Sequence, residues 1–295
     1  MATLRDLKTR IGSVASSEKI TGAMKMISSA KVHMNELSLK KLAPFRKQIQ
    51  SIMGHILSTD ENFNSPLIEE REVNHVSVVV FGSDDGLCGA YNMNIFKGFL
   101  VSLNHLKEKY GKDLKVTAYP VGGKIVKAMK RLESPEFEVV VTEGVDSKMP
   151  GERVTEFTHM LRDSFVKGDT DLVEVVYMRY ISMGKQVITT DQLFPVLAED
   201  LLKQEDGVDE NQLYIFEPDA NSIFNEVLPM FVTSTMQEIT VENRTSEQAA
   251  RVMAMQSAND NAKKLYDELK LEYNKLRQES ITTELLDILG GQVER

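Results

Sequence analysis

The chain has 295 residues, of which 42% are hydrophobic and 27% are charged, and it carries a formal net charge of −9. Its single cysteine, Cys88, excludes a disulfide framework and favours a reducing compartment. No run of about 18 apolar residues is present that could span a bilayer. The basic N-terminus lacks the apolar core of a signal peptide, so we interpret it as mature structure.

The charge is distributed unevenly along the chain. Residues 1–58 carry ten Lys or Arg and three Asp or Glu, a net +7, which leaves −16 for the remainder. A basic segment on an acidic protein indicates an acidic partner, inside the chain or outside it. Nucleic acid is disfavoured as that partner, because Phe45 is the only aromatic side chain that the segment offers for stacking on bases.

Residues 1–58 are predicted to form a long coiled-coil helix. Thr3 and Asp6 have the spacing of a capping pair at its start, and Pro44 predicts a kink or a break near Ala43. The apolar positions recur mostly at steps of three and four residues, which is typical of a helix that packs on a partner helix. The expected stripe comprises Leu4, Leu7, Ile11, Val14, Ile20, Met24, Ile27, Met34 and Leu37.

A linker is expected at residues 59–74, and an α/β domain at residues 75–215. Short β-branched runs alternate there with helical patterns, which predicts parallel crossovers around one sheet in a Rossmann-like arrangement. The last strand closely follows a turn at residues 182–185, so we expect it to pair antiparallel as a hairpin. The predicted strands are Val76–Phe81, Lys115–Val121, Glu136–Val141, Leu172–Tyr180 and Gln186–Leu193, and the predicted helices are Asn94–Tyr110, Lys124–Leu132 and Glu152–Lys167.

The domain is expected to end in an acidic loop, Glu199–Glu210, and a short apolar segment, Tyr214–Phe216. Residues 216–295 are then predicted to form a second coiled-coil helix.

This second helix is expected to be capped by Asn221 or Ser222, and Pro229 is expected to interrupt its first turns. From Met230 to Leu289 the sequence contains no Pro or Gly, and a helix of that length reaches about 90 Å. Gly290 and Gly291 are the expected stop signal. The apolar stripe of this helix comprises Val232, Met236, Ile239, Val252, Met255, Leu265, Leu269, Leu276, Leu285, Leu286 and Leu289.

The stripe lapses into polar residues at 242–248 and at 256–264. A regular coiled-coil homodimer does not usually interrupt its seam in this way. The pattern therefore disfavours self-association through this stripe.

The sequence offers no chemistry at the place where α/β sheets often bind ligands. The loop Gly82–Gly89 follows the first strand, but it lacks the GxGxxG pattern and carries Asp84 and Asp85 where a phosphate needs amides and cations. The five histidines are dispersed, no Walker sequence is present, and Cys88 has no identifiable base. We predict no catalytic residue, no cofactor and no metal site.

Four blocks of sequence resemble the γ subunit of F-type ATP synthases, in the correct order across nearly the whole chain. They are Ile20–Met26 with Ser29–Lys31, the loop Ser83–Gly89, Glu238–Leu265 and Tyr273–Leu286. The last block is the most distinctive. The resemblance is to the bacterial type of this subunit. It implies an α+β fold, in which the N- and C-terminal helices wrap as an antiparallel coiled coil and the inserted α/β domain forms a foot.

The resemblance also implies a central-stalk rotor that is not an enzyme by itself. The shaft turns inside a hexamer of α and β subunits, and the foot docks with the ε subunit and the membrane c-ring. The polar lapses of the second helix are then expected to face these other subunits, in particular β. The protein is expected on the cytoplasmic face of the bacterial plasma membrane, attached only through the complex. Residues implied to meet the hexamer are Met24, Arg251, Gln278, Thr282 and Glu284, and the implied foot-domain loop contains Gly86, Leu87, Cys88 and Gly89.

Two positions depart from the family pattern. Asp85 replaces the usual Arg, which reverses a charge, and Gly22 stands where a basic residue is common, which we expect to soften the shaft near Met24. Two alternatives remain open from the residues alone. One is an α/β enzyme with coiled-coil oligomerisation arms, and the other is a coiled-coil tether.

Overall fold

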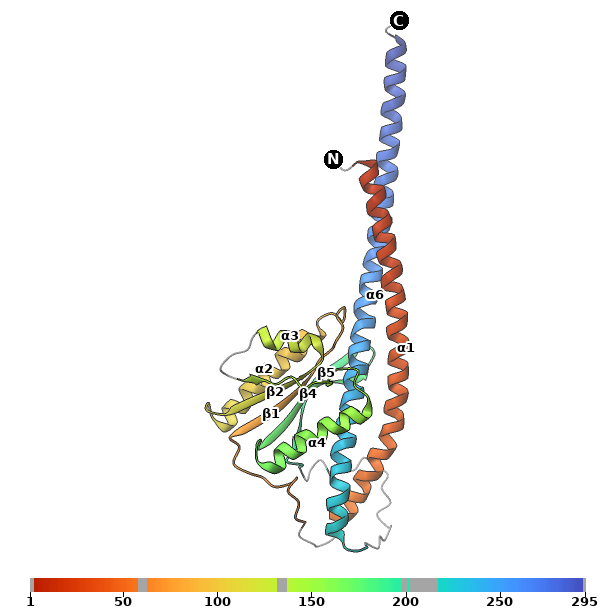
Figure 1. Cartoon of the computed structure of the whole chain (residues 1–295). Helices are drawn as coiled ribbons and strands as arrows, with labels where there is room; N and C mark the ends of the chain where they lie inside the picture. Colours follow the sequence, from red (N-terminus) through yellow and green to blue (C-terminus); the bar gives the residue numbers. More distant parts are fainter. Residues whose placement is uncertain (1–2, 58–62, 132–136, 198–200, 202–216, 294–295) are drawn as a thin grey trace. The chain divides into compact units, whose positions relative to one another are not determined.

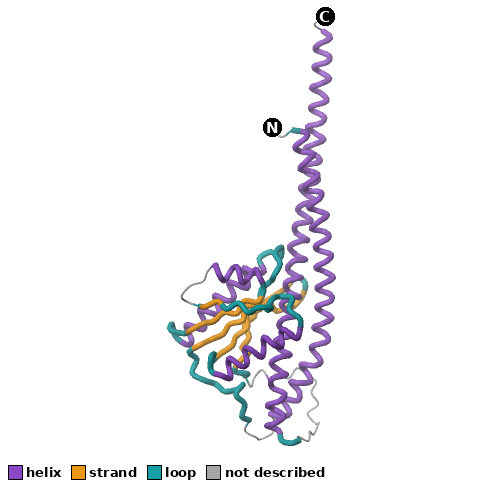
Figure 2. Tube along the Cα trace, in the orientation of Figure 1, coloured by secondary structure: helices purple, strands orange, loops and turns teal. Residues whose placement is uncertain are grey.

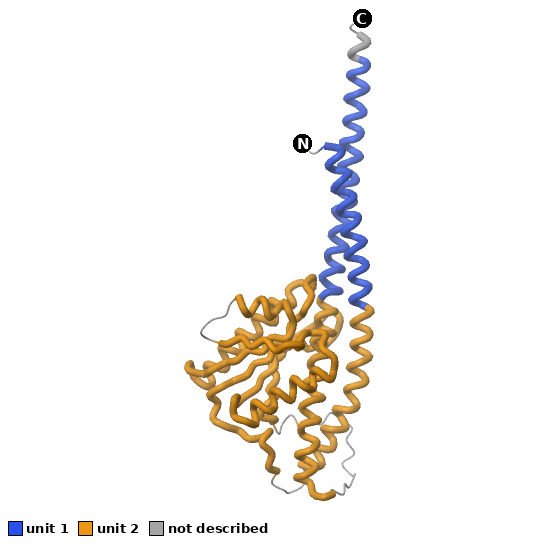
Figure 3. Tube along the Cα trace, viewed as in Figure 1, with its two compact units in different colours: residues 1–29, 251–295 blue, residues 30–250 orange. Residues whose placement is uncertain are grey.

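The computed structural model describes residues 3–57, 63–131, 137–197, 201 and 217–293, including the backbone but not the side chains of 290–293. The chain forms two compact units, each described here by itself (Figure 3). Unit 1 is Met1–Ser29 with Arg251–Arg295, and unit 2 is Ala30–Ala250. The helices α1 (Leu4–Leu57) and α6 (Ala220–Val293) contribute to both units. The acidic loop and the Tyr214–Phe216 segment lie outside the described residues.

Unit 2 contains a five-stranded sheet with the order β3-β2-β1-β4-β5. The first four strands pair in parallel, and β5 pairs antiparallel to β4, which confirms the predicted crossovers and the predicted hairpin. The third strand is much shorter than predicted. The strands are β1 (His75–Phe81), β2 (Lys115–Val121), β3 (Glu138–Val139), β4 (Leu172–Ser182) and β5 (Lys185–Phe194).

Three shorter helices connect the strands, and different elements cover the two faces of the sheet (Figures 1 and 2). They are α2 (Tyr91–Tyr110), α3 (Gly123–Arg131) and α4 (Gly151–Lys167). One apolar cluster joins α2 and α3 to side chains such as Val78 and Val80 of β1. A second cluster joins α4, α1 and α6 to the alternate side chains Val79 and Phe81. The period-two alternation of the strand therefore directs its side chains into two separate cores.

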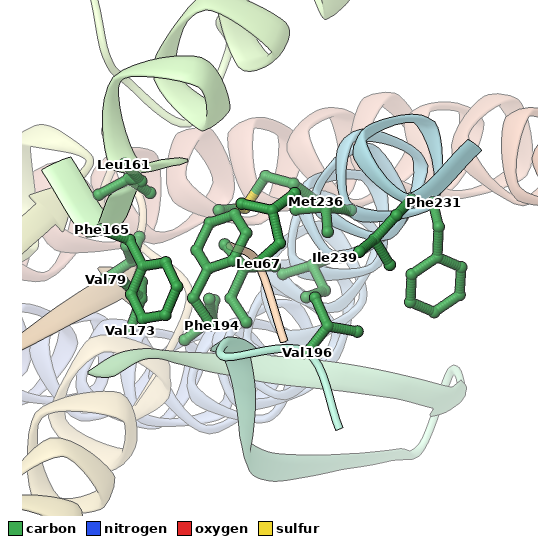
Figure 4. Close-up of a cluster of buried hydrophobic side chains, with 14 of the residues drawn as sticks. Leu67, Val79, Leu161, Phe165, Val173, Phe194, Val196, Phe231, Met236 and Ile239 are labelled. Atoms are coloured by element: carbon green, nitrogen blue, oxygen red, sulfur yellow. The ribbon is translucent and has the colours of Figure 1, made fainter. Parts of the chain in front are cut away.

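The second cluster holds both long helices against the sheet within unit 2 (Figure 4). Met236 and Ile239 of α6 pack with Phe194 of β5, and the Phe165 and Phe194 rings stack at 5.3 Å between centroids. From α1 the buried residues are Ile49, Met53 and Ile56. This packing explains why Pro44 does not end α1 as predicted, because the helix on its C-terminal side is fixed by the core.

The ends of the long helices confirm one prediction and correct three. Thr3 and Asp6 exchange the expected capping hydrogen bonds. At the start of α6, however, the cap is Asp219, whose carboxylate accepts hydrogen bonds from the backbone N–H and the hydroxyl of Ser222 at 2.8 and 2.7 Å. The helix continues through Pro229 without interruption, and it runs past the two expected stop glycines to Val293.

Unit 1 is an antiparallel pair formed by the N-terminal part of α1 and the C-terminal part of α6 (Figure 3). Asn259 of α6 donates hydrogen bonds to the carbonyl oxygen of Glu18 at 2.7 Å and to the Thr21 hydroxyl at 3.4 Å. Beyond the N-terminus, α6 continues as a single helix. The antiparallel pair and the unpaired C-terminal excess agree with the fold expected from the resemblance.

The predicted apolar stripes were partly wrong about which side chains are covered. The stripe residues found buried are Leu7 on α1 and Val232, Met236, Ile239, Val252, Met255 and Leu269 on α6. Other stripe residues are exposed because steps of three and four residues drift around a straight helix over many turns, and because α6 continues beyond the N-terminus of α1. The stripe residues found exposed are Ile20, Ile27, Met34 and Leu37 on α1, and Leu265, Leu285, Leu286 and Leu289 on α6.

Candidate functional site

The loop after β1 uses its carboxylates to organise the chain itself. Asp84 accepts hydrogen bonds from the backbone N–H of Gly123 at 2.8 Å and from the backbone N–H and hydroxyl of Ser147 at 3.1 and 2.7 Å. Gly123 is the first residue of α3, so the carboxylate takes the position at a helix N-terminus that a phosphate group could otherwise occupy. The second carboxylate, Asp85, pairs with Lys148 at 2.8 Å.

The tip of the same loop presents an apolar side chain. Leu87 has a φ of 63° and its side chain is exposed, whereas the neighbouring Cys88 is buried. Positive φ is uncommon for a residue with a side chain, which marks the tip as a conformation held by its surroundings. Of the four predicted loop residues, Leu87 is therefore the one whose side chain is best placed to meet another protein.

A hydrogen-bonded group fixes the base of the loop. The Asn92 carboxamide accepts a bond from the backbone N–H of Ser83 at 3.0 Å and donates to the Ser83 hydroxyl at 2.7 Å. Its amide nitrogen also lies 3.5 Å from the Cys88 sulfur. Gly122 directly follows β2 and has a φ of 112°. Because it has no side chain, the end of β2 can pass close to Ser83, whereas a Cβ on Gly122 would lie 2.9 Å from the Ser83 carbonyl.

The five predicted shaft residues all lie on α1 or α6, but they differ in exposure. Gln278, Thr282 and Glu284 are exposed, and Met24 is half-buried. Arg251 is only 5% exposed and has an interaction within the chain. A direct contact between Arg251 and another subunit therefore requires a local rearrangement.

Gln278 and Thr282 lie one helical turn apart on one face of α6, and the Thr282 hydroxyl donates to the Gln278 carbonyl at 2.8 Å. Glu284 points elsewhere around the helix, because two residues correspond to about 200° of rotation. The structure therefore groups two of the predicted residues on one face and leaves the others apart.

The first polar lapse was wrongly expected to face other subunits. Within residues 242–248 the side chains of Asn243, Thr245, Ser246 and Glu247 are almost completely buried inside the protein. Asn243 and Arg244 bond to the α/β domain, as described below. The sequence did not reveal these buried polar residues. A polar interruption in an apolar stripe looks the same whether the side chains face a sheet or solvent.

The helical pair displays large apolar side chains that no part of unit 1 covers. Met26 on α1 is 69% exposed, and Leu271 on α6 is 72% exposed. Exposed large apolar side chains in this number on one helical pair are typical of a surface that meets another protein. The exposed set in unit 1 also includes Ile20, Ile27, Met253, Leu265, Ile281, Leu285, Leu286, Ile288 and Leu289.

Neither a metal cluster nor a membrane span was found in the part of the chain that the structure describes. No group of three His, Cys, Asp or Glu side chains there could hold a metal ion. No described helix is both long and apolar enough to cross a bilayer.

Comparison with known proteins matches the full length of the chain. A family model described as ATP synthase matches residues 3–293. The chain is 36% identical over 303 residues to the ATP synthase gamma chain of Bacteroides thetaiotaomicron, with all of both chains covered. It is 37% identical over 291 residues to that of Parabacteroides distasonis, covering 99% of this chain and 98% of the relative.

Solved structures show the same fold. The chain aligns with a TM-score of 0.62 and 20% identity to a chain of the Euglena gracilis mitochondrial ATP synthase, covering 98% of this chain and 93% of the other. A central-stalk chain from Tetrahymena thermophila aligns with a TM-score of 0.55 and 19% identity, covering 81% and 99%. The chain belongs to the ATP synthase gamma chain family.

Proposed function

We propose that the protein is the rotor of an ATP synthase central stalk, which couples rotation of a membrane c-ring to the conformational cycle of the catalytic sites. The gamma chain is a non-catalytic subunit of its complex. The α/β domain acts as the foot that docks with the ε subunit and the c-ring. The paired part of α1 and α6, and the C-terminal excess of α6, act as the shaft inside the hexamer of α and β subunits.

The uncovered apolar surface of the helical pair is the observation that carries this proposal. Leu285, Leu286, Ile288 and Leu289 are all exposed within one turn and a half of α6. At about 100° per residue the four side chains span an arc of about 160° on one side of α6, and they leave water only if another protein surface covers that side. The wall of a central opening in a hexamer supplies such a surface.

The rotor interpretation also explains why an asymmetric shaft is useful. A single shaft meets three catalytic sites unequally, and its differential contacts bias the conformation of each site. The net +7 of residues 1–58 would favour acidic surfaces on the surrounding subunits. Family membership replaces the enzyme and tether alternatives, which have no comparable support.

The finer assignments belong to the same proposal. The functional division into a helix at 1–58, a linker at 59–74, a foot at 75–215 and a helix at 216–295 follows from the rotor role. The bacterial origin of the relatives similar in sequence supports a location at the cytoplasmic face of the plasma membrane, with this chain attached peripherally through the complex.

Affinity purification from the source membranes tests the proposal. A tagged chain should recover α and β ATPase subunits together with ε and the c-ring. A variant with Leu285, Leu286 and Leu289 changed to Ser should recover less of the α and β subunits, because the apolar contact is lost. Recovery of the tagged wild-type chain without α and β subunits would refute the rotor assignment.

A further inference from the structure

The carboxyl edge of the sheet between β1 and β4 is occupied by a side chain of the chain's own helix α6. Within the strand order, β1 is flanked by β2 and β4, so the direction of winding reverses between β1 and β4. In open α/β sheets this switch point, at the carboxyl ends of the strands, is where ligands bind. Here the side chain of Asn243, from the first polar lapse of α6, lies at that point.

Asn243 bonds to both strands that flank the switch point. Its amide nitrogen donates to the carbonyl oxygen of Gly82, directly after β1, at 3.1 Å. Its carboxamide oxygen accepts from the backbone N–H of Met178 in β4 at 3.4 Å. The β1–β4 ladder ends at the pair Val80 and Val176, two residues before these groups. The carboxamide thus acts as an inserted peptide group that satisfies the backbone where the two strands diverge.

The helix α2 also forms a hydrogen bond with the Asn243 side chain. The Tyr91 hydroxyl, at the start of α2, donates to the Asn243 carboxamide oxygen at 2.6 Å and lies 2.9 Å from its backbone oxygen. Asn243 is 1% exposed, so these bonds form away from water, where a lost partner is costly. One residue of α6 therefore binds β1, β4 and α2 at once.

The next residue extends the attachment to the loop before α4. The Arg244 guanidinium donates to the carbonyl oxygen of Ser147 at 2.5 Å and to that of Met149. Ser147 is in turn bound by Asp84, whose other oxygen caps α3. Asn243 and Arg244 therefore connect α6 to both sides of the carboxyl edge of the sheet.

We propose that Asn243 and Arg244, with Tyr91, form the torque junction between the α/β domain and α6, at the position that ligand-binding sheets keep open. Apolar packing is non-directional, so the cluster around Met236 and Ile239 resists separation of the helix better than it resists sliding or rotation. Hydrogen bonds have fixed lengths and angles, and the three at the Asn243 side chain oppose rotation of the helix. This role rests on the proposed rotor function.

The experiment compares variants in the assembled ATP synthase, reconstituted in lipid vesicles. Asn243→Ala removes the side-chain bonds to all three elements and leaves the contact of the Tyr91 hydroxyl with the backbone oxygen of residue 243. Tyr91→Phe removes only the hydroxyl while keeping the ring. Thr240→Ala is the matched control, because Thr240 is buried three residues away on the same helix and its hydroxyl bonds only to the Met236 carbonyl of that helix among the described contacts. Two rates are measured on the same vesicles. The first is the rate of ATP synthesis driven by an imposed ion gradient, and the second is the rate of ATP hydrolysis by the hexamer complexes after detergent releases them. The quantity compared is the first rate divided by the second.

We expect this ratio to fall several-fold in Asn243→Ala, to fall less in Tyr91→Phe, and to stay at the wild-type value in Thr240→Ala. The torsional stiffness of single complexes, measured by twisting the shaft through a handle on the α/β domain, should fall most in Asn243→Ala, less in Tyr91→Phe and not at all in Thr240→Ala. Complex content is normalised by the amount of β subunit, so a variant that assembles poorly still yields a ratio. If Asn243→Ala does not assemble, the ratio in Tyr91→Phe is compared with the ratio in Thr240→Ala, and a lower ratio in Tyr91→Phe supports the junction.

Two results would overturn the junction. One is an unchanged ratio in both Asn243→Ala and Tyr91→Phe, and the other is a fall in Thr240→Ala as large as theirs, which would reduce the effect to general destabilisation. Either result leaves the rotor function intact, since the wild-type chain still assembles with the ATPase subunits. Failure of the wild-type chain to assemble would instead refute the proposed function.

Discussion

The Asn259 side chain of α6 and the Glu18 carbonyl of α1 are joined by a 2.7 Å hydrogen bond in the helical pair. Gly22 leaves room for the Asn259 side chain, because a Cβ at that position would lie 3.3 Å from the Asn259 amide nitrogen, closer than an ordinary contact. The second polar lapse, at residues 256–264, therefore contains a side chain that faces its partner helix. A polar residue at such a seam position fixes the register of paired helices.

We expect Gly22→Ala to stabilise the chain less than its helix propensity alone predicts. The gain of about 1 kcal/mol for Ala over Gly is reduced because Asn259 must shift to admit the methyl group. In an Asn259→Ala background the same substitution should give the full gain. Chemical denaturation of the four chains in a double-mutant cycle measures this coupling.

Gly12→Ala is the control for this cycle, since no heavy atom lies within 4 Å of a Cβ at Gly12. It should stabilise the chain equally in both backgrounds. Equal gains from Gly22→Ala in both backgrounds would show that Gly22 does not make room for Asn259.

Asp85 and Lys148 form an ion pair at the position where the family usually carries Arg. The carboxylate beside Lys148 raises the pKa of its ammonium group. Both side chains are about 60% exposed, so the pair contributes less than about 1 kcal/mol. Asp85→Arg should lower the free energy of unfolding by about 0.5–1 kcal/mol at low salt, because two cations then face each other.

The double variant Asp85→Arg with Lys148→Glu should regain the lost stability. High salt should remove most of the difference between the variants by screening the charges. Denaturation midpoints at low and high salt measure both effects. No recovery in the double variant would mean that Asp85 acts through contacts other than Lys148.

Glu242 is expected to make stability depend on pH. Burial raises the pKa of its carboxyl group to about 7, against the opposing effect of Arg179. The charged groups around it are Arg46 of α1, Arg179 of β4, Asp191 of β5 and Glu238 of α6. Since the folded pKa exceeds the unfolded value of 4.5, the stabilising contribution is fully present below about pH 4.5 and is lost as the pH rises through about 7.

Glu242→Gln should therefore raise the free energy of unfolding above wild type at pH 8, by on the order of 1 kcal/mol, and leave it nearly unchanged at pH 4.5. Denaturation of the isolated chain at several pH values checks this slope. Glu226→Gln changes an exposed carboxylate on the same helix and serves as the control. A stability gain that is equal at both pH values would contradict the assignment to Glu242 ionisation.

Gln278→Ala combined with Thr282→Ala should lower ATP synthesis and hydrolysis in the assembled complex. The two side chains share one exposed face of α6, where the shaft is proposed to meet the β subunits. A loss of two polar contacts predicts a decrease of roughly tenfold in turnover. ATPase and synthesis rates per assembled complex provide the measurement.

The neighbouring pair Glu279 and Thr283 offers a matched control. The Thr283 hydroxyl donates to the Glu279 carbonyl at 2.9 Å, which repeats the Thr282 and Gln278 geometry about 100° around the helix. Replacing both control residues with Ala should affect the rates less. Unchanged rates in the first double variant would remove Gln278 and Thr282 from the proposed contact face.

The sequence by itself determined the elements that depend on local physics. Short β-branched runs alternating with helical patterns predicted the parallel strands, and the turn at residues 182–185 predicted the hairpin. The Thr3 and Asp6 pair predicted the first helix cap. The long stretch without Pro or Gly predicted the shaft. Pattern alone could not determine the exact ends, because Asp219 competes with Asn221 and Ser222 as a cap and only the local backbone decides which side-chain oxygen reaches the free N–H groups.

Only the tertiary structure decided what each side chain faces. Leu269 and Leu285 belong to the same sequence stripe, yet Leu269 is buried and Leu285 is exposed, because the pairing with α1 covers only part of α6. Asn243 and Gln278 are both polar residues of α6, but the sheet edge lies against the first, whereas the second is exposed. A helical period gives the direction of a side chain around its own axis, whereas its surroundings come from segments distant in sequence.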